Sequence, residues 1–339
     1  MTKTITRSIK NLTTVAALFC NQSTDQFYND IKCNQLPWSE AAKEYWQDLY
    51  NLYRVMLDSD FVTALSKDSF SGIWELTIVH FLSSHHEKGL NLISHKKKSS
   101  IPDFCADILG SRFYFEAICV SPGNIPELKV TLSEVSGKAR RTPVAENMER
   151  LTAAIREKGH TKYYGEKACG YKCAMEDGSG LVIAISIAKI QFHNRSNNFI
   201  EDLRCIFGIS SMKIPLAQDS NRHYKMGTPY HEQQLTFEKT SNKEMENKRG
   251  SPLKMDYFAN DEYAHISAML LSYDGRVFFP NIEIFDGILW NECRNDFILI
   301  HNPFAKNPLP VGFFDVSLEV TATHADNKMT LNMHKPKVN

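Results

Sequence analysis

The sequence lacks both a long hydrophobic run and an excess of charge of either sign. Its 339 residues hold 39 Lys and Arg against 39 Asp and Glu, so the formal net charge is zero. No stretch reaches the ~18–20 consecutive apolar residues of a membrane-spanning helix, and the apolar run at 14–20 is too short for a signal peptide. We therefore expect a cytoplasmic protein without a membrane partner. Any binding of nucleic acid would depend on local basic patches rather than on overall charge.

Several motifs and spacings with known chemistry are also missing. The chain contains no G-x-x-x-x-G-K-[ST], G-x-G-x-x-G or G-x-S-x-G, so nucleotide-cofactor chemistry and a nucleophile elbow have no support. Most of the eight cysteines lie inside apolar runs, which favours buried free thiols in a reducing compartment. Cys169 and Cys173 are separated by three residues and have no second pair, so a zinc site is weakly supported.

The patterning that is present predicts an α/β fold in which helices flank a mixed central sheet. Hydrophobic residues make up 42% of the chain and charged residues 23%, as in a globular protein. Periodicity predicts helices at 41–57, 61–65, 71–85, 144–158 and 198–207, and strands at 90–93, 103–109, 112–120, 181–187, 264–272, 276–279 and 296–301.

The same patterning suggests three parts of the chain. Residues 1–36 are polar and mixed, and we expect a variable N-terminal arm there. Residues 37–210 form the α/β core. Residues 211–339 form an appended α+β part, with a long polar insertion at 211–257 before further strands and a short tail; this part could also belong to the same domain.

Two carboxylates stand on one predicted β-hairpin. The turn signal Gly110-Ser111 separates its two strands. A turn centred there pairs Asp103 with Ile118 and Cys105 with Glu116, so Asp103 and Glu116 become diagonal neighbours on the face opposite a hydrophobic layer. Their Cβ atoms would lie roughly 5–8 Å apart, which one cation can bridge.

A third carboxylate, Glu75, lies on the predicted helix 71–85 that leads into this sheet. Three converging carboxylates supply the hard oxygen ligands that Mg²⁺ or Mn²⁺ prefers. The alternative is that these acids are solvated residues on an exposed face of the sheet.

These residues resemble a known family. Trp74-Glu75-Leu76, Pro102-Asp103-Phe104 and Phe115-Glu116-Ala117 together look like the PD-(D/E)XK, or restriction-endonuclease-like, nuclease superfamily, in a divergent bacterial form. The resemblance covers about residues 70–190 and implies a core of helix, three-stranded meander, helix and strand. It further implies that Glu75, Asp103 and Glu116 bind Mg²⁺, and that the chain hydrolyses phosphodiester bonds in DNA or, as a second choice, RNA.

The chain departs from the family pattern at one position. Where the superfamily has a lysine two residues after the second acid, this sequence has Ile118. Lys158 and Arg150 lie along one face of the predicted helix 144–158 and are the candidates to replace that lysine. The alternative for both is an ordinary solvated helix face.

Two basic clusters are candidates for contacts to nucleic-acid phosphates, which would position a substrate without reading its bases. They consist of Lys96, Lys97 and Lys98, and of Lys138, Arg140 and Arg141. Solvated loops are an equal alternative. Because two strands need two sites, the resemblance also suggests a homodimer.

Three functional hypotheses remain open at this stage. The first is a metal-dependent nuclease that hydrolyses DNA. The second, favoured by Ile118 and the neutral charge, is a catalytically degenerate nuclease fold that acts as a binding or effector module. The third is a hydrolase that uses the same acids on a substrate other than nucleic acid.

Overall fold

The computed structural model describes sixteen stretches of the chain, and all structural statements below concern these stretches. They are residues 17–35, 39–93, 101–125, 128, 143–159, 163–164, 167–168, 178–190, 195–209, 217–218, 224–225, 234–238, 253, 255–273, 297–325 and 328–334. The predicted strand 276–279, Cys169, Cys173 and most of the polar insertion at 211–257 lie outside them.

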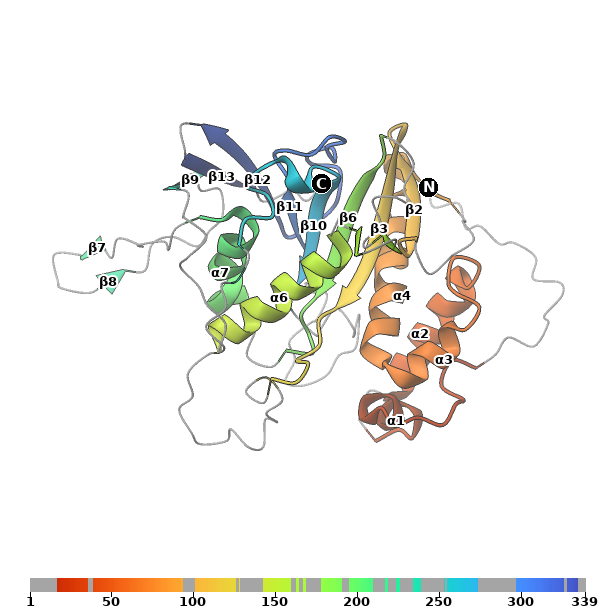
Figure 1. The fold of residues 1–339 in the computed structure, drawn as a ribbon. Helices are drawn as coiled ribbons and strands as arrows, with labels where there is room; N and C mark the ends of the chain where they lie inside the picture. The colour runs from red at the N-terminus through yellow and green to blue at the C-terminus, as the bar shows by residue number, and fades with distance from the viewer. Residues whose placement is uncertain are drawn as a thin grey trace.

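A mixed sheet of nine strands forms the centre of the molecule (Figure 1). Its spatial order is β1-β2-β3-β6-β10-β11-β12-β13-β9. The strands are β1 (Leu90–Ile93), β2 (Phe104–Ile108), β3 (Ser111–Cys119), β6 (Gly180–Ser186), β9 (Gln234–Glu238), β10 (Ile266–Ser272), β11 (Ile298–His301), β12 (Leu318–Ala325) and β13 (Lys328–His334). The expected α/β class, with helices flanking a large mixed sheet, is confirmed.

Three neighbouring strands, β3, β6 and β10, run parallel. Helix α6 (Val144–Gly159) connects β3 to β6, and α7 (Arg195–Phe207) lies between β6 and β10 in the chain. Every residue of β6 and β10 is buried, as expected for strands that are covered on both faces. The remaining neighbours pair antiparallel, except for β11 with β12.

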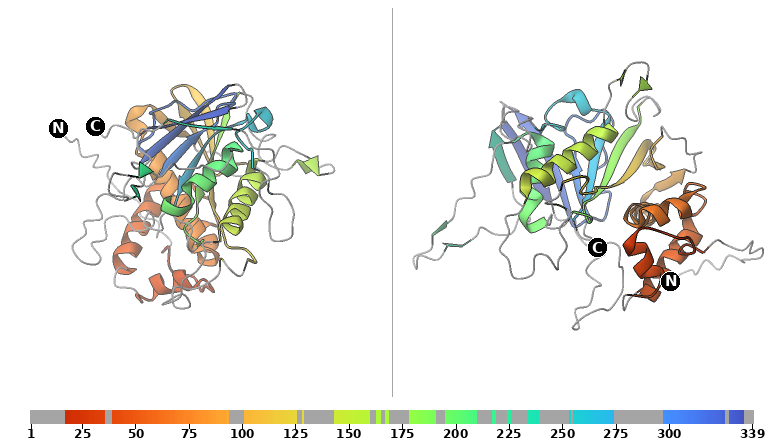
Figure 2. Two further views of the ribbon diagram at one scale, coloured as in Figure 1. Left: turned by 90° about the vertical axis from the view of Figure 1, so that its left-hand side faces the viewer. Right: turned by 60° about the horizontal axis from the view of Figure 1, so that its bottom comes forward.

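Helices cover the sheet on two faces (Figure 2). On one face lie α1 (Gln26–Lys32), α2 (Ser39–Tyr53), α3 (Phe61–Lys67) and α4 (Ser69–Ser83), with α4 against the strands; the short 3₁₀ turn η1 (His86–Lys88) follows α4. The buried Trp74 of α4 donates a hydrogen bond from Nε1 to the Ala184 carbonyl oxygen on β6 at 3.0 Å. On the other face, α6 and α7 cover a second core made by alternate residues of the same strands.

The hairpin β2–β3 differs from the sequence prediction in its turn. The turn is centred on Leu109 and Gly110, both with positive φ, of 50° and 88°. The register therefore pairs Cys105 with Tyr114 and Phe104 with Phe115, two residues away from the predicted pairing. Because a shift of two residues keeps each side chain on its face, the predicted hydrophobic layer is retained.

Both ends of the chain contribute more to the core than the sequence indicated. Leu18, Tyr28 and Ile31, from the expected N-terminal arm, are completely buried. β13 occupies part of the expected tail, and β9, from the expected insertion, pairs with it at the edge of the sheet. The strands β9 to β13, all after residue 211, thus extend the central sheet itself. The short pairs β4–β5 (Tyr163–Tyr164, Lys167–Ala168) and β7–β8 (Ala217–Gln218, Tyr224–Lys225) and the 3₁₀ turn η3 (Asp261–Tyr263) complete the described elements.

Within the described residues, no helix combines the length and the apolar character needed to cross a membrane.

Candidate active site

The site is built on the two strands of the hairpin. The last observed pair of the register is Phe104 with Phe115, and Asp103 precedes the first residue while Glu116 follows the second. The hairpin thus brings both acids to adjacent positions on neighbouring strands. Both are buried, with relative exposures of 9% for Asp103 and 3% for Glu116. The Asp103 carboxylate accepts a hydrogen bond from the Ala117 backbone N–H at 2.7 Å, which fixes it against β3.

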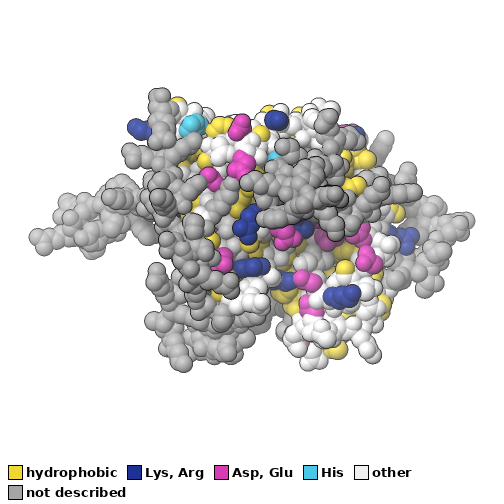
Figure 3. Space-filling view, viewed as in Figure 1, with side chains coloured by type: hydrophobic (Ala, Val, Ile, Leu, Met, Phe, Trp, Pro, Cys, Tyr) yellow, Lys and Arg dark blue, Asp and Glu magenta, His cyan; other side chains and the backbone are white. Residues whose placement is uncertain are grey.

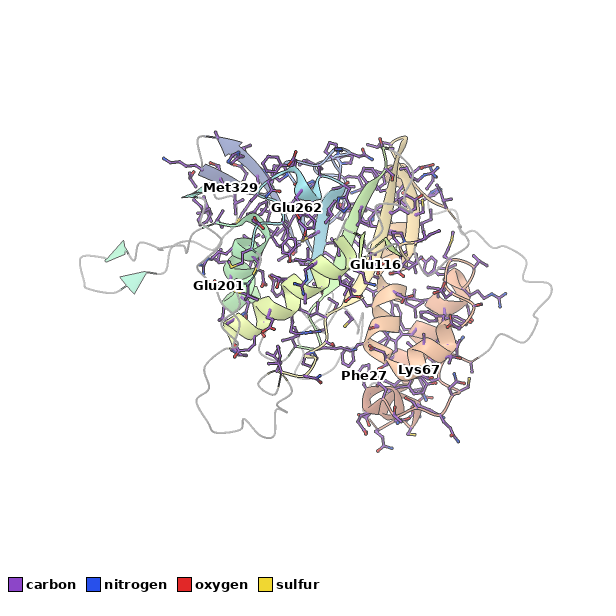
Figure 4. All side chains as sticks on the ribbon, in the orientation of Figure 1. Phe27, Lys67, Glu116, Glu201, Glu262 and Met329 are labelled. Carbon is purple, nitrogen blue, oxygen red and sulfur yellow. The ribbon has the colours of Figure 1, made fainter. Side chains whose placement is uncertain are left out.

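A lysine from α6 reaches the second acid. Lys158 Nζ lies 3.0 Å from Glu116 Oε1, and the lysine side chain keeps 27% of its surface exposed. Glu157 Oε1 lies 3.7 Å from the same ammonium group and is on the solvent side, with an exposed fraction of 73%. The ammonium group therefore bridges the buried strand position and the surface. Figure 4 labels Glu116 on β3.

Ile118, at the position where the superfamily that the chain resembles has a lysine, is half-buried and packs against the core between the sheet and α6. Its neighbour on β6 is Ile185. An ammonium group there would lie partly buried against apolar side chains, which costs free energy. Of the two candidates to replace that lysine, Lys158 is the one whose ammonium group contacts Glu116.

Arg150 lies two turns away from Lys158 on α6 and has a different partner. Its Nε donates to the Ser121 carbonyl oxygen at 2.7 Å, and Nη2 lies 3.4 Å from Ser121 Oγ. A Cβ added at Gly123, which has a φ of +59°, would be 3.0 Å from the guanidinium carbon. Arg150 therefore holds the segment that leaves β3, and its contacts do not include the two acids.

Glu75 lies on a different element. It is half-buried on α4, between Trp74 and Leu76, which belong to the core on the other face of the sheet. Within the described stretches, no group of three or more His, Cys, Asp and Glu side chains is placed to hold a metal ion. The contacts described here bring together two acids, Asp103 and Glu116, and one lysine, Lys158.

The chemistry of these donors fits a hard divalent cation. Mg²⁺ is commonly bound through one or two carboxylates and completes its shell with waters and substrate phosphate oxygens. Asp103 and Glu116 supply two carboxylates from adjacent backbone positions, which are donors of the kind that Mg²⁺ or Mn²⁺ takes.

The predicted phosphate-contact residues Lys96, Lys97, Lys98, Lys138, Arg140 and Arg141 lie outside the described residues. On the face seen in Figure 3, the Lys and Arg side chains that are drawn in colour are interspersed with Asp and Glu. That part of the surface therefore carries both signs of charge.

Two contact residues were not singled out from the sequence. Ser121 and Gly123 form the segment that Arg150 holds. Pro122 and Gly123 are residue types typical of loops, but nothing in the sequence pointed to the arginine.

No protein-family model, no curated protein and no solved structure matches this chain.

Proposed function

We propose that the chain is a metal-dependent nuclease that hydrolyses phosphodiester bonds, with DNA as the preferred substrate and RNA as the second choice. The observation that carries this proposal is the distance of 3.0 Å between Lys158 Nζ and Glu116 Oε1. It puts an ammonium group beside the second acid although the usual lysine position holds Ile118.

The order of elements adds support. From α4 to β6 the chain runs through a helix, the meander β1–β2–β3, the helix α6, and a strand parallel to β3. This is the order that the PD-(D/E)XK resemblance implies. A restriction-endonuclease-like core within the larger sheet is accordingly part of the proposal.

Each residue has a distinct part in the reaction. Asp103 and Glu116 would hold the divalent cation, with Glu75 as the additional acid that the resemblance implies. When bound, such a cation polarises a phosphate oxygen and lowers the pKa of a coordinated water. Lys158 would hold the attacking water by a hydrogen bond and offset the negative charge that develops on the phosphate. Its partial exposure leaves it accessible to a substrate from the surface.

Cleavage assays on the full chain test the proposal. We expect Mg²⁺- or Mn²⁺-dependent cleavage of DNA by the parent, with a loss of at least about 100-fold in Asp103→Asn, Glu116→Gln and Lys158→Met, as for other positioned catalytic groups. Glu157→Gln is the matched control, because it removes an exposed acid beside the same lysine and should keep activity. The proposal fails if the folded parent cuts neither DNA nor RNA with either metal, or if the three variants cut as fast as the parent.

One observation favours a second candidate, a catalytically silent binding module. Lys158 and Glu116 neutralise each other's charge, and the half-buried Ile118 packs against the core. A module of this kind would gain no thermal stability from Mg²⁺, because a ligand stabilises only the state that it binds. A melting temperature that rises with Mg²⁺ in the parent, and not in Asp103→Asn, would decide against this candidate.

A further inference from the structure

A buried histidine joins the end of α4 to a distant segment of the chain. His85 follows α4, and 2% of its surface is exposed. The rings of Phe81, Phe313 and Phe314 surround it, with centroids at 4.8, 6.2 and 4.9 Å. Phe313 and Phe314 belong to the loop between β11 and β12, which thereby packs against α4.

Both ring nitrogens of His85 have backbone partners. Nδ1 lies 2.8 Å from the Phe81 carbonyl oxygen, which can only accept a hydrogen bond. Nε2 lies 2.9 Å from the backbone nitrogen of Asp315, which can only donate one. Together the two contacts require a neutral imidazole with its proton on Nδ1, because Nε2 must offer a lone pair to the Asp315 N–H. Ser84 Oγ, 3.2 Å from Nδ1, is compatible with this tautomer because a hydroxyl can accept.

We propose that His85 is an acid-sensitive joint, whose neutral ring ties residues 313–315 to the end of α4 and whose protonation releases them. If Nε2 took up a proton from solvent, that proton would face the Asp315 N–H. The hydrogen bond from the Asp315 N–H to Nε2 would then be lost. The new N–H would turn to the Asp315 carboxylate, whose Oδ2 is 3.7 Å away. While His85 is neutral, the same carboxylate pairs with Lys88 Nζ at 2.6 Å. Protonation of His85 would therefore also draw the carboxylate away from Lys88.

The electrostatic surroundings favour the neutral ring. Burial lowers the pKa of His85 below the ordinary value, and Lys88 lowers it further, while the Phe81 carbonyl and the Asp315 carboxylate oppose the shift without cancelling it. Among the described residues, Asp315 and Lys88 are the charged groups that face the ring, and both are substantially exposed, at 59% and 42%. A folded-state pKa below that of the unfolded chain means that the joint is intact above about pH 6.5 and weakens as the pH falls toward the folded value.

Hydrogen exchange of the full chain between pH 7.5 and 5 tests the inference. After correction for the intrinsic exchange rate, we expect the opening constant of amides 313–315 to rise about tenfold for each pH unit between about 6.5 and the folded-state pKa of His85. Amides of β6 serve as the internal reference. His85→Gln should abolish this dependence because glutamine does not titrate, and His86→Gln, at the exposed neighbouring histidine, should retain it. Asp315→Asn should move the midpoint to lower pH.

The inference is overturned if His85→Gln keeps the parent's pH dependence, or if the parent shows none. Should His85→Gln fail to fold, an NMR titration of the parent ring decides instead. A neutral ring protonated at Nδ1 that titrates below about pH 6.5 is expected, and titration at or above that value would refute the joint. None of these outcomes depends on nuclease activity.

Discussion

Lys158 of α6 and Glu116 of β3 form an ion pair at 3.0 Å in which the carboxylate is almost fully buried and the ammonium group reaches the surface. The pair joins the helix to the strand that it follows in the chain. It is therefore a structural contact as well as a candidate catalytic one, and its two roles can be measured separately.

Removing the lysine should cost stability. Lys158→Met leaves the buried Glu116 without this cation, and because the lysine is partly exposed we expect a loss of about 2 kcal/mol in the free energy of unfolding, below the range for fully buried pairs. The double variant Lys158→Met/Glu116→Gln should recover part of that loss, since the charge is then gone. Urea unfolding of the two single variants and the double variant measures the coupling, and a coupling near zero would contradict a stabilising pair.

Arg150 and Gly123 should be coupled through space. Gly123→Ala is strained by its φ of +59° and also meets the guanidinium group, so we expect it to cost more than about 1 kcal/mol in the parent. In Arg150→Ala the steric part disappears, and the added cost of Gly123→Ala should fall to about 1 kcal/mol. Equal costs in the two backgrounds would show that the arginine does not press on this segment.

The hairpin turn offers a stabilising substitution. Leu109 has a φ of +50° and is 64% exposed, so it adopts a strained backbone conformation and gains little from burial. We expect Leu109→Asn to stabilise the protein by about 0.5–1 kcal/mol, because asparagine tolerates this conformation in turns of this kind. Leu52→Asn, at a leucine of similar exposure within α2, is the control and should give no gain. Thermal unfolding compares the two.

The thiol of Cys119 should react slowly with alkylating reagents in the folded protein. Burial raises the pKa of its thiol to about 12, while the nearby Lys189 opposes the shift. At pH 8 the thiolate fraction is roughly a thousandfold below that of an ordinary cysteine, so we expect iodoacetamide to label the exposed Cys20 and Cys33 long before Cys119.

Because the folded-state pKa of Cys119 is raised, its contribution to stability is complete below about pH 8.5 and is lost as the pH rises toward 12. Mass spectrometry of labelled peptides, with urea-unfolded protein as the control, measures the rates. Equal rates for Cys119 and Cys20 in the folded state would contradict the raised pKa of Cys119.

The placement of the two acids on one face of the hairpin could be predicted, because side chains alternate along a strand. Asp103 and Glu116 stand on the side away from Phe104 and Phe115, and this alternation is readable in the sequence. The register could not be predicted, because turn preferences favour Gly110-Ser111, whereas the structure places a leucine in a left-handed conformation.

Lys158 was identified as a candidate only because its spacing puts it on one face of its helix with Arg150. Spacing alone could not tell which of them would meet the acids, since that depends on how α6 lies against β3.

The edge strands could not be predicted for another reason. β9 lies in a polar region and β13 close to the end of the chain, and both become strands through pairing with each other and with β12.

The middle of the sheet has a consequence for how this protein is made. β6 is apolar along its length and receives its second neighbour, β10, only after about eighty further residues have been synthesised. Until then a nascent chain presents an unpaired hydrophobic edge, which is the kind of surface that drives aggregation. Fragments that end before β10 should therefore aggregate or remain bound to chaperones, although they contain every residue of the proposed catalytic centre.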